Sequence, residues 1–280
     1  MIGTGTRLIC LLGSPVAHSR SPAMHNAAFA ELGLDMAYLA FDVGRENLRD
    51  AIVGLKALGF AGGNITAPHK QAAVSLVDAL EDVASRIGAI NTLVYREGIL
   101  EGHNTDIHGF LMALELGWGR SPKGVRALVL GAGGAARAVV AGLVEAGAEQ
   151  VHIYNRTYQR AVGLCEDASM WGPTRCAVVR EDRLGEVAAE VDLVVNTIPL
   201  GKEDGIKFSP LPVDTIGESH VVMDLNYSGG QTTILRCAAD KGALTIDGRE
   251  MLVQQAVRSF ELWTDRAAPV KMMRERAENY

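Results

Sequence analysis

Residues 125–157 read VRALVLGAGGAARAVVAGLVEAGAEQVHIYNRT, which places a strand, a glycine-rich turn, a helix and a second strand in succession. Gly131, Gly133 and Ala136 fit the pattern G-x-G-x-x-A, in which the turn lets a pyrophosphate approach the backbone at the positive end of the helix. Gly147 is placed to end that helix in a left-handed conformation. The segment therefore predicts a dinucleotide-binding domain of the Rossmann type.

The end of the second strand indicates which dinucleotide is bound. An acidic residue there would bond the ribose 2′-hydroxyl of NAD, and no acid follows Tyr154 directly. The chain instead offers Asn155, Arg156, Thr157 and Arg160, which can surround a 2′-phosphate with charge-assisted hydrogen bonds. NADP is therefore the predicted cofactor, with the alternative that the arginines only solvate a helix start.

Outward from this segment, apolar periodicity predicts two α/β units with largely parallel sheets. The predicted strands are Arg7–Leu12, Met36–Phe41, Phe60–Ile65, Thr92–Arg96, Ile99–His103, Arg126–Leu130, Gln150–Tyr154, Leu193–Asn196 and Val221–Asp224. The predicted helices are Ser21–Gly33, Arg45–Leu58, Leu80–Gly88, Asp106–Trp118 and Met251–Ala267. Glu97-Gly98 predicts a hairpin turn, the first unit closes near residue 104, and the last helix is expected to pack back on it.

Composition narrows the class of partner. The 280 residues carry a net charge of −6, with a pI near 5.7, so there is no basic field to hold nucleic acid or an anionic membrane. The apolar start LICLLG is too short for the core of a signal peptide, and no apolar run reaches membrane-spanning length, so neither a signal peptide nor a membrane span is expected. Four cysteines lack disulfide or zinc spacing, which predicts reduced, buried thiols in a cytoplasmic protein. Small molecules are the expected partners.

Polar residues gather where strands of the first unit are predicted to end, in GSPVAHSRSPAMHN, GGNITAPHK, GAINT and GHNTD. In open α/β sheets these ends form the ligand crevice. The segments supply hydroxyls, amides, a lysine and a carboxylate, a lining that suits a small polyhydroxylated acid. These residues are Ser19, Ser21, Asn64, Thr66, Lys70, Asn91, Asn104 and Asp106. Ser21 and Thr66 are equally plausible as helix N-caps.

Lys70 is the candidate for proton transfer. It follows Pro68 in what is predicted to be the first turn of a helix, where the dipole and partial burial disfavour the charged ammonium and lower the pKa. A lowered pKa suits proton exchange near neutral pH. Asp106 would orient the ammonium, although a lone lysine is more often a solvated surface residue.

Seven motifs together resemble the shikimate dehydrogenase family in family order: GSPVAHSRSPAMHN, NITAPHK, GAINT, NTD, GAGGAARA, NRT and GREMLVQQA. The resemblance covers nearly the whole chain. It implies an N-terminal α/β substrate domain of residues 1–104 and 242–280, and an NADP-binding Rossmann domain of residues 105–241. It further implies hydride transfer between NADP and a cyclic hydroxy acid, shikimate, whose ketone is 3-dehydroshikimate. Lys70 and Asp106 would be the catalytic pair, and no metal would be required.

The resemblance also implies roles for individual residues. Ser19 and Ser21 match serines that bind the substrate carboxylate, with Tyr227 near it, and Asn64 belongs to the same lining. The positions that match residues bonding the ring hydroxyls are Thr66, Asn91, Asp106 and Gln255. The implied cofactor residues at the pyrophosphate are Gly131, Gly133, Gly134 and Ala135, and those at the adenosine phosphate are Asn155, Arg156, Thr157 and Arg160. The rest of the cofactor set is Thr197, Ile198, Leu225, Gly248 and Met251. Of these, Gly248 and Met251 match positions that lie against the nicotinamide.

Three departures from the usual family pattern concern specificity. Ile107 stands where the family usually has Gly, Ile198 replaces a frequent Thr, and Thr233 stands where Pro is usual. Paralogues that accept quinate or an aminoshikimate therefore remain an alternative. An alternative of another class is a catalytically silent NADP-binding module. Among enzymes, a methylenetetrahydrofolate-type dehydrogenase is also an alternative, but it would leave the motifs HSRSP and GREMLVQQA unexplained. Both a monomer and a homodimer are compatible with the sequence.

Overall fold

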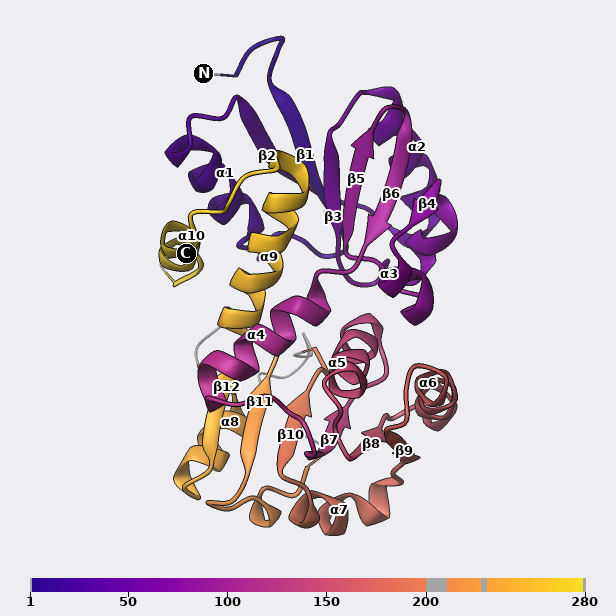
Figure 1. Ribbon diagram of the computed structural model, residues 1–280, viewed down its shortest axis with the longest axis vertical. Coiled ribbons are helices and arrows are strands. Elements are labelled where there is room, and N and C mark those ends of the chain that lie inside the picture. Colours follow the sequence, from indigo (N-terminus) through magenta and orange to yellow (C-terminus); the bar gives the residue numbers. More distant parts are fainter. Residues whose placement is uncertain (1, 200–210, 228–230, 279–280) are drawn as a thin grey trace. The chain divides into compact units, whose positions relative to one another are not determined.

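The segment at residues 125–157 forms the predicted elements, β7 (Arg126–Leu130), α5 (Gly134–Glu145) and β8 (Gln150–Tyr154). The computed structural model describes residues 2–199, 211–227 and 231–278 (Figure 1). Gly147 has a φ of 79° just past the end of α5, and the N–H of Ala148 donates to the carbonyl of Leu143. The predicted left-handed end of this helix is therefore confirmed.

The chain divides into two units, one made of the residues up to Gly109 and from Leu252 onward, the other of Phe110–Met251. These divisions fall inside α4 (Asp106–Trp118) and α9 (Gly248–Thr264). The sequence instead suggests boundaries at 104/105 and 241/242. The second difference has a clear physical reason, because residues 244–247 form a strand that pairs within the Phe110–Met251 unit.

The sheet of the Phe110–Met251 unit has six parallel strands in the order β12-β11-β10-β7-β8-β9. Its further strands are β9 (Arg175–Val178), β10 (Leu193–Asn196), β11 (Val221–Asp224) and β12 (Leu244–Asp247). Numbered within the unit, this is the strand order of a dinucleotide-binding Rossmann domain, whose order reverses between β7 and β10. Ligands of such sheets bind beyond the carboxyl ends of the strands at that point.

Helices cover both faces of this sheet (Figure 1). On one face, α4, α5 and α6 (Tyr158–Ser169) pack on Ala127 and Val129. On the other, α7 (Leu184–Glu190) and α8 (Thr233–Asp240) pack on Leu128 and Leu130. Burial on both faces explains why β7 is apolar from Ala127 to Leu130 rather than alternating. The unit also contains the short 3₁₀ helices η3 (Glu181–Arg183) and η4 (Val213–Thr215).

The other unit has a mixed sheet in the order β2-β1-β3-β5-β6-β4. Its strands are β1 (Arg7–Gly13), β2 (Met36–Asp42), β3 (Gly62–Ile65), β4 (Ala79–Leu80), β5 (Thr92–Arg96) and β6 (Ile99–His103). β1 pairs in parallel with β2 and β3, β4 pairs in parallel with β6, and β5 is antiparallel to both β3 and β6. Glu97 and Gly98 both have positive φ, so the predicted β5–β6 hairpin turn is confirmed.

Two helical layers enclose most of this sheet (Figure 1). The helices α1 (Ser21–Glu31), α9 and α10 (Val270–Glu278) pack on Ile9 and Leu11, on one face. The elements η1 (Arg45–Asn47), α2 (Leu48–Ala57), η2 (Ala72–Leu76) and α3 (Asp82–Ile87) belong to the opposite side, where α2, η2 and α3 pack on Cys10 and Leu12. Both units therefore have α/β architecture, as the sequence predicts.

Asn26 of α1 reaches the outer strand of this sheet. Its side-chain amide donates to the carbonyl oxygen of Tyr38 on β2 at 2.9 Å, and its amide oxygen accepts the Tyr38 N–H at 2.8 Å. One side chain thus satisfies both backbone groups of a residue on a strand with only one neighbouring strand.

His25, next to Asn26 in α1, lies in an aromatic core. It stacks on Tyr38 with ring centroids 4.7 Å apart and meets Trp263 edge-on at 5.0 Å. The side chain is fully buried, and burial lowers the pKa of His25 to about 3. His25 is therefore a neutral core residue at any pH near neutrality.

Several predicted elements differ in detail from the structure. Ser21 is the first residue of α1 rather than its N-cap, and its N–H donates to Ser19 Oγ at 3.3 Å. The last predicted helix is α9, which ends at Thr264 and is followed by α10. The sequence predicts neither α10 nor the outer strands β4, β9 and β12, and it gives no bounds for α6, α7 and α8. Of the cysteines, which are all free, only Cys10 is buried, while the other three are partly exposed.

Candidate active site

Lys70 and Asp106 form an ion pair in the mixed-sheet unit. Lys70 Nζ lies 2.5 Å from Asp106 Oδ2, and the two side chains are only 16% and 6% exposed. Asp106 is the first residue of α4, while Lys70 lies in the turn between β3 and η2. The structure therefore brings together the two residues that the sequence singles out for proton transfer.

Two asparagines fix the carboxylate side of this pair. Asn91 Nδ2 donates to Asp106 Oδ1 at 2.9 Å, so each oxygen of the carboxylate has its own donor. Asn104 Oδ1 accepts the N–H groups of Asp106 and Ile107, at 3.1 and 3.4 Å, which caps the start of α4. The two amides therefore hold the backbone and the side chain of Asp106.

Backbone and histidine contacts hold the lysine side. The sequence predicts Lys70 in the first turn of a helix, and this prediction is wrong. Lys70 lies in a tight turn in which the N–H of His69 donates to the carbonyl of Thr66. The carbonyl of Lys70 accepts the N–H of Ile90, and His69 Nε2 lies 2.7 Å from the carbonyl oxygen of Val43. Neighbouring segments thus fix this turn from two sides.

The other predicted substrate residues of this unit lie at strand ends or on α9. Ser19 is half-buried and Ser21 buried, between β1 and the start of α1, and Thr66 directly follows β3. Gln255 lies on α9, and its Oε1 is 3.4 Å from Asn91 Nδ2. Asn91 is thereby in contact with both Asp106 and Gln255.

Asn64 is already occupied by protein partners. It is 6% exposed, and its Oδ1 accepts the hydroxyl of Tyr38 at 2.8 Å. Its Nδ2 donates to the carbonyl of Asn91 and to the hydroxyls of Thr92 and Ser259, at 3.0 to 3.1 Å. Sequence reasoning missed Ser259, because a serine inside an apolar helix pattern has no local signature of its partners.

The turn after β7 fits a dinucleotide pyrophosphate. Gly131 has a φ of 113°, and a Cβ there would lie 2.3 Å from Thr197 Oγ1, so the turn requires glycine. Gly133 precedes α5, and a Cβ there would meet nothing within 4 Å, which leaves its backbone accessible. Gly134 and Ala135 form the first turn of α5, where free N–H groups favour an anion.

The remaining predicted cofactor residues of this unit lie near the carboxyl ends of its strands. Thr197 and Ile198 follow β10 beside Gly131, and a Cβ at Gly248 would lie 2.3 Å from the carbonyl oxygen of Leu225, which follows β11. Tyr227 is half-buried two residues later, whereas Met251 is 7% exposed and packs in the core of the unit. Residues 200–210, which follow Ile198 and Pro199, and residues 228–230, which follow Tyr227, lie outside the described residues.

The predicted adenosine-phosphate residues surround the β8–α6 turn. Thr157 immediately precedes α6, and the Arg160 N–H donates to its carbonyl. Asn155 Nδ2 also donates to that carbonyl, at 2.9 Å. Arg156 and Arg160 are both exposed, one on the turn and one on the first turn of α6.

Sequence reasoning also missed the role of a buried carboxylate at the end of β11. Asp224 is fully buried, and its Oδ1 accepts bonds from Asn196 Nδ2 and from the backbone and side chain of Asn226. Asn226 Nδ2 in turn donates to the carbonyl of Ile198 at 2.9 Å. Asp224 therefore fixes the loops that carry Ile198 and Leu225. An acid ending the apolar run VVM was the available signal.

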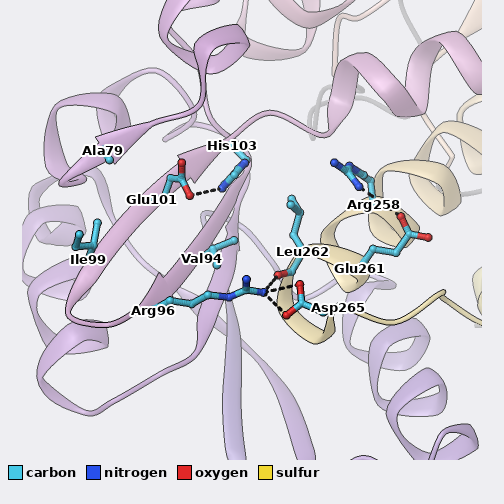
Figure 2. Close-up of a pocket in the computed structure, with 10 residues that line it drawn as sticks. All are labelled: Ala79, Val94, Arg96, Ile99, Glu101, His103, Arg258, Glu261, Leu262 and Asp265. Carbon is cyan, nitrogen blue, oxygen red and sulfur yellow. Dashed lines mark hydrogen bonds and ion pairs between the residues drawn. The ribbon is translucent and has the colours of Figure 1, made fainter.

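A separate cavity of about 650 Å³ lies in the mixed-sheet unit (Figure 2). It is bounded by the exposed face of β5 and β6, by Ala79 and by α9, and none of the predicted substrate residues lines it. His103 in its wall contacts Glu101 and Glu81. Burial opposes the charge on His103, but the hydrogen bond with Glu81 and the charges of both acids outweigh it and raise the pKa of His103.

Neither a metal cluster nor a membrane span is found in the described parts of the chain. Across residues 2–199, 211–227 and 231–278, no three His, Cys, Asp or Glu side chains are grouped to hold a metal ion. Over the same ranges, none of the helices is long and apolar enough to cross a bilayer.

Three family models match successive parts of the chain. They are the shikimate dehydrogenase substrate binding domain over residues 11–93, shikimate / quinate 5-dehydrogenase over residues 118–200, and the shikimate 5′-dehydrogenase C-terminal domain over residues 248–278. A relative from Moorella thermoacetica named shikimate dehydrogenase (NADP(+)) is 46% identical over 275 residues, which cover 97% of this chain and 92% of the relative. The chain belongs to the shikimate dehydrogenase family. The resemblance inferred from the motifs is confirmed.

Solved structures agree with membership of the shikimate dehydrogenase family. Shikimate 5-dehydrogenase from Thermus thermophilus, solved with NADP(H) and shikimate, is 42% identical with a TM-score of 0.86, covering 98% of this chain and 99% of that one. Quinate dehydrogenase from Corynebacterium glutamicum, solved with NAD, is 32% identical with a TM-score of 0.89, with the same coverage. The fold is therefore shared by family members that are named for different substrates and were solved with different cofactors.

Proposed function

We propose that this chain catalyses the reversible NADP-dependent reduction of 3-dehydroshikimate to shikimate. The observation that carries the proposal is the Lys70–Asp106 pair, 2.5 Å apart and mostly buried, in a chain of this family. A catalytically silent binding module would have no use for a buried lysine and carboxylate held by Asn91.

In the proposed mechanism Lys70 moves the proton. Oxidation of an alcohol removes a hydride from carbon and a proton from oxygen, and bound NADP supplies the hydride acceptor, or in its reduced form the donor. Lys70 Nζ takes the proton of the substrate hydroxyl and returns it in the reverse direction. Asp106 holds the ammonium in place through Oδ2, while Asn91 holds Oδ1. The proposal assigns no role to a metal.

The substrate assignment rests on the polar residues at the strand ends of the mixed-sheet unit. Ser19 and Ser21 bind the carboxylate, with Tyr227 near it, and Thr66, Asn91 and Gln255 bond the ring hydroxyls together with Asp106. Asn64 completes this lining by holding Asn91, since its own amide is taken by protein groups. In this proposal the unit of residues 1–109 and 252–280 is the substrate domain, and the Phe110–Met251 unit is the NADP domain.

The cofactor assignment rests on the turn after β7 and the start of α6. Gly131, Gly133, Gly134 and Ala135 receive the pyrophosphate, where Gly133 has open space beside its backbone. Asn155, Arg156, Thr157 and Arg160 hold the 2′-phosphate. Thr197, Ile198, Leu225, Gly248 and Met251 complete the cofactor set. We further propose a cytoplasmic enzyme that is a monomer or a homodimer.

The first experiment measures initial rates of NADP⁺ reduction at 340 nm with shikimate and quinate in parallel, and repeats both with NAD⁺. We expect kcat/KM to be highest for shikimate with NADP⁺. Equal rates with quinate would favour the paralogue suggested by Ile107, Ile198 and Thr233. NADP⁺ binding without turnover of either acid would favour the silent module.

Lys70→Met tests the mechanism. We expect kcat to fall by roughly 10²- to 10⁴-fold, the usual contribution of a positioned acid or base, while the Kd for NADP⁺ stays the same. Lys56→Met is the matched control, because Lys56 forms a partly exposed ion pair with Asp78 at 2.6 Å in the same unit. A Lys70 variant with wild-type kcat would remove this residue from the mechanism.

A further inference from the structure

The hydroxyl of Ser259 lies at the centre of a buried hydrogen-bond network behind the Lys70–Asp106 pair. Ser259 is fully buried on α9. Its Oγ lies 2.8 Å from Thr92 Oγ1 and 3.2 Å from Thr105 Oγ1, and it accepts a bond from Asn64 Nδ2 at 3.1 Å. It donates to the carbonyl of Gln255 at 3.0 Å. All four partners of this hydroxyl are polar groups of the same unit.

The network continues to the catalytic carboxylate through Asn91. The Thr105 N–H donates to Asn91 Oδ1 at 2.8 Å, which fixes the orientation of the amide. Asn91 Nδ2 therefore points the other way and donates to Asp106 Oδ1 and to Thr105 Oγ1, both at 2.9 Å. Asn91 therefore links the hydrogen-bond network around Ser259 to Asp106.

The Ser259 hydroxyl is an acceptor for the threonine hydroxyls around it. Its single proton is used on the carbonyl of Gln255, so its two lone pairs are shared by three neighbouring donors, Asn64 Nδ2 and the hydroxyls of Thr92 and Thr105. Without that oxygen, the nearest acceptor for both threonines is Asn91 Oδ1, at 3.1 and 3.2 Å. That oxygen already accepts the Thr105 N–H and has room for one more bond. The second hydroxyl would be left with the longer 3.3 Å contact to the other threonine's Oγ1, or would compete with the Thr105 N–H for the amide oxygen.

We propose that Ser259 is a positioning residue, which holds Asn91 in the orientation that presents an N–H to Asp106. The inference rests on the proposed function, since it concerns the same proton transfer. Gln255, one turn earlier on α9, contacts Asn91 directly at 3.4 Å, whereas Ser259 acts through Thr92 and Thr105.

Ser259→Ala tests the inference. We expect kcat for shikimate oxidation to fall roughly 10-fold, as for a small displacement of a catalytic group, with KM for NADP⁺ unchanged. Thr264→Ala is the control: Thr264 makes the same type of bond on α9, to the carbonyl of Phe260 at 2.8 Å.

A compensating substitution separates positioning from simple loss of packing. In Thr92→Val/Ser259→Ala the stranded hydroxyl of Thr92 is gone, and removing both partners costs less than removing one. We expect the double variant to recover at least about 3-fold of the lost kcat. Ser259→Thr, which keeps the hydroxyl, should also retain activity. Wild-type kcat in Ser259→Ala, or a double variant slower than the single one, would overturn the inference.

Hydrogen exchange decides the inference independently of turnover. The Thr105 N–H, which Asn91 Oδ1 accepts, should exchange faster in Ser259→Ala than in wild type, and the Thr264→Ala control should leave it unchanged. If wild type does not oxidise shikimate, the proposed function fails while this measurement still tests the network. Unchanged exchange at Thr105 would show that Ser259 does not hold Asn91.

Discussion

Arg156 is exposed on the β8–α6 turn, and Arg160 follows it on the first turn of α6. Neither position requires an arginine for packing, so selection of the cofactor is the reason we propose for both. A guanidinium bonds a phosphate through a planar pair of N–H groups and has no equivalent partner in NAD.

Arg156→Ala should therefore raise KM for NADP⁺ by about 10-fold or more, since hydrogen bonds to charged groups contribute about 1.5–3 kcal/mol, and leave KM for NAD⁺ unchanged. Steady-state rates with both cofactors provide the measurement. Arg183→Ala is the control, because Arg183 is an exposed arginine of the same unit paired with Glu186. Equal losses with NADP⁺ and NAD⁺ would argue against a phosphate contact.

His25 should make stability depend on pH. Its pKa is about 3 in the folded protein and 6.5 when solvated, so below pH 6.5 the unfolded chain binds a proton that the folded chain does not. The free energy of unfolding should therefore fall as the pH drops below 6.5, by up to about 1.4 kcal/mol per unit. His25→Leu should remove this slope between pH 6.5 and 5.5 in urea unfolding. An unchanged slope would mean that His25 becomes protonated in the folded state.

Among individual residues, the sequence predicts those that belong to contiguous motifs. It does not predict residues whose roles depend on contacts with distant parts of the chain. Lys70 and Asp106 lie within NITAPHK and NTD, so a resemblance identifies them. Ser259 and Asp224 acquire their roles from partners far along the chain, such as Thr105 and Asn196. No local pattern specifies those partners.

Among the elements, buried strands are the best predicted. The bounds of β5, β6, β7, β8, β10 and β11 agree with the sequence, because most of these strands are apolar and end at turn residues. The missed strands β4, β9 and β12 are at most four residues long and partly exposed, which leaves little apolar periodicity. Pro68 wrongly predicts a helix start at Lys70, because the chain makes a tight turn there instead.

Two glycines should respond oppositely to alanine. Gly147 has a φ of 79° at the end of α5, so Gly147→Ala should lower the free energy of unfolding by roughly 1 kcal/mol. Gly163 lies inside α6, and a Cβ added there would meet nothing within 4 Å, so Gly163→Ala should raise it by about 0.5–1 kcal/mol. Urea unfolding of both variants checks the signs. A stabilising Gly147→Ala would contradict the left-handed helix end.

For the whole molecule, each unit has its own sheet and its own cores on both faces. The strand order of the Phe110–Met251 unit could be anticipated from its nucleotide-binding motif, since that order is shared by Rossmann domains. The mixed sheet of the other unit could not, because no residue pattern indicates that β5 lies antiparallel to β3. Nor does the sequence show that residues 244–247 join the Phe110–Met251 unit.

Cofactor binding should stabilise the protein through that unit. NADP⁺ at 100 times its Kd should raise the free energy of unfolding by about 2.7 kcal/mol, because only the folded state binds it. Hydrogen exchange should slow around Gly133 and Arg156 when NADP⁺ is added alone, and stay constant in β1 and β2. Protection confined to β1 and β2 would place the cofactor in the mixed-sheet unit and contradict the proposed NADP site.

The contact between Asn26 and Tyr38 has a consequence for behaviour at high protein concentration. Asn26 occupies the N–H and carbonyl of Tyr38, two of the backbone groups through which an incoming strand would extend the sheet, on a strand where Leu39 and Phe41 are 42% and 41% exposed. An apolar outer strand with free backbone groups is a template for joining one molecule to another. By occupying these groups at Tyr38, Asn26 disfavours that kind of association, a role that an activity assay would not detect.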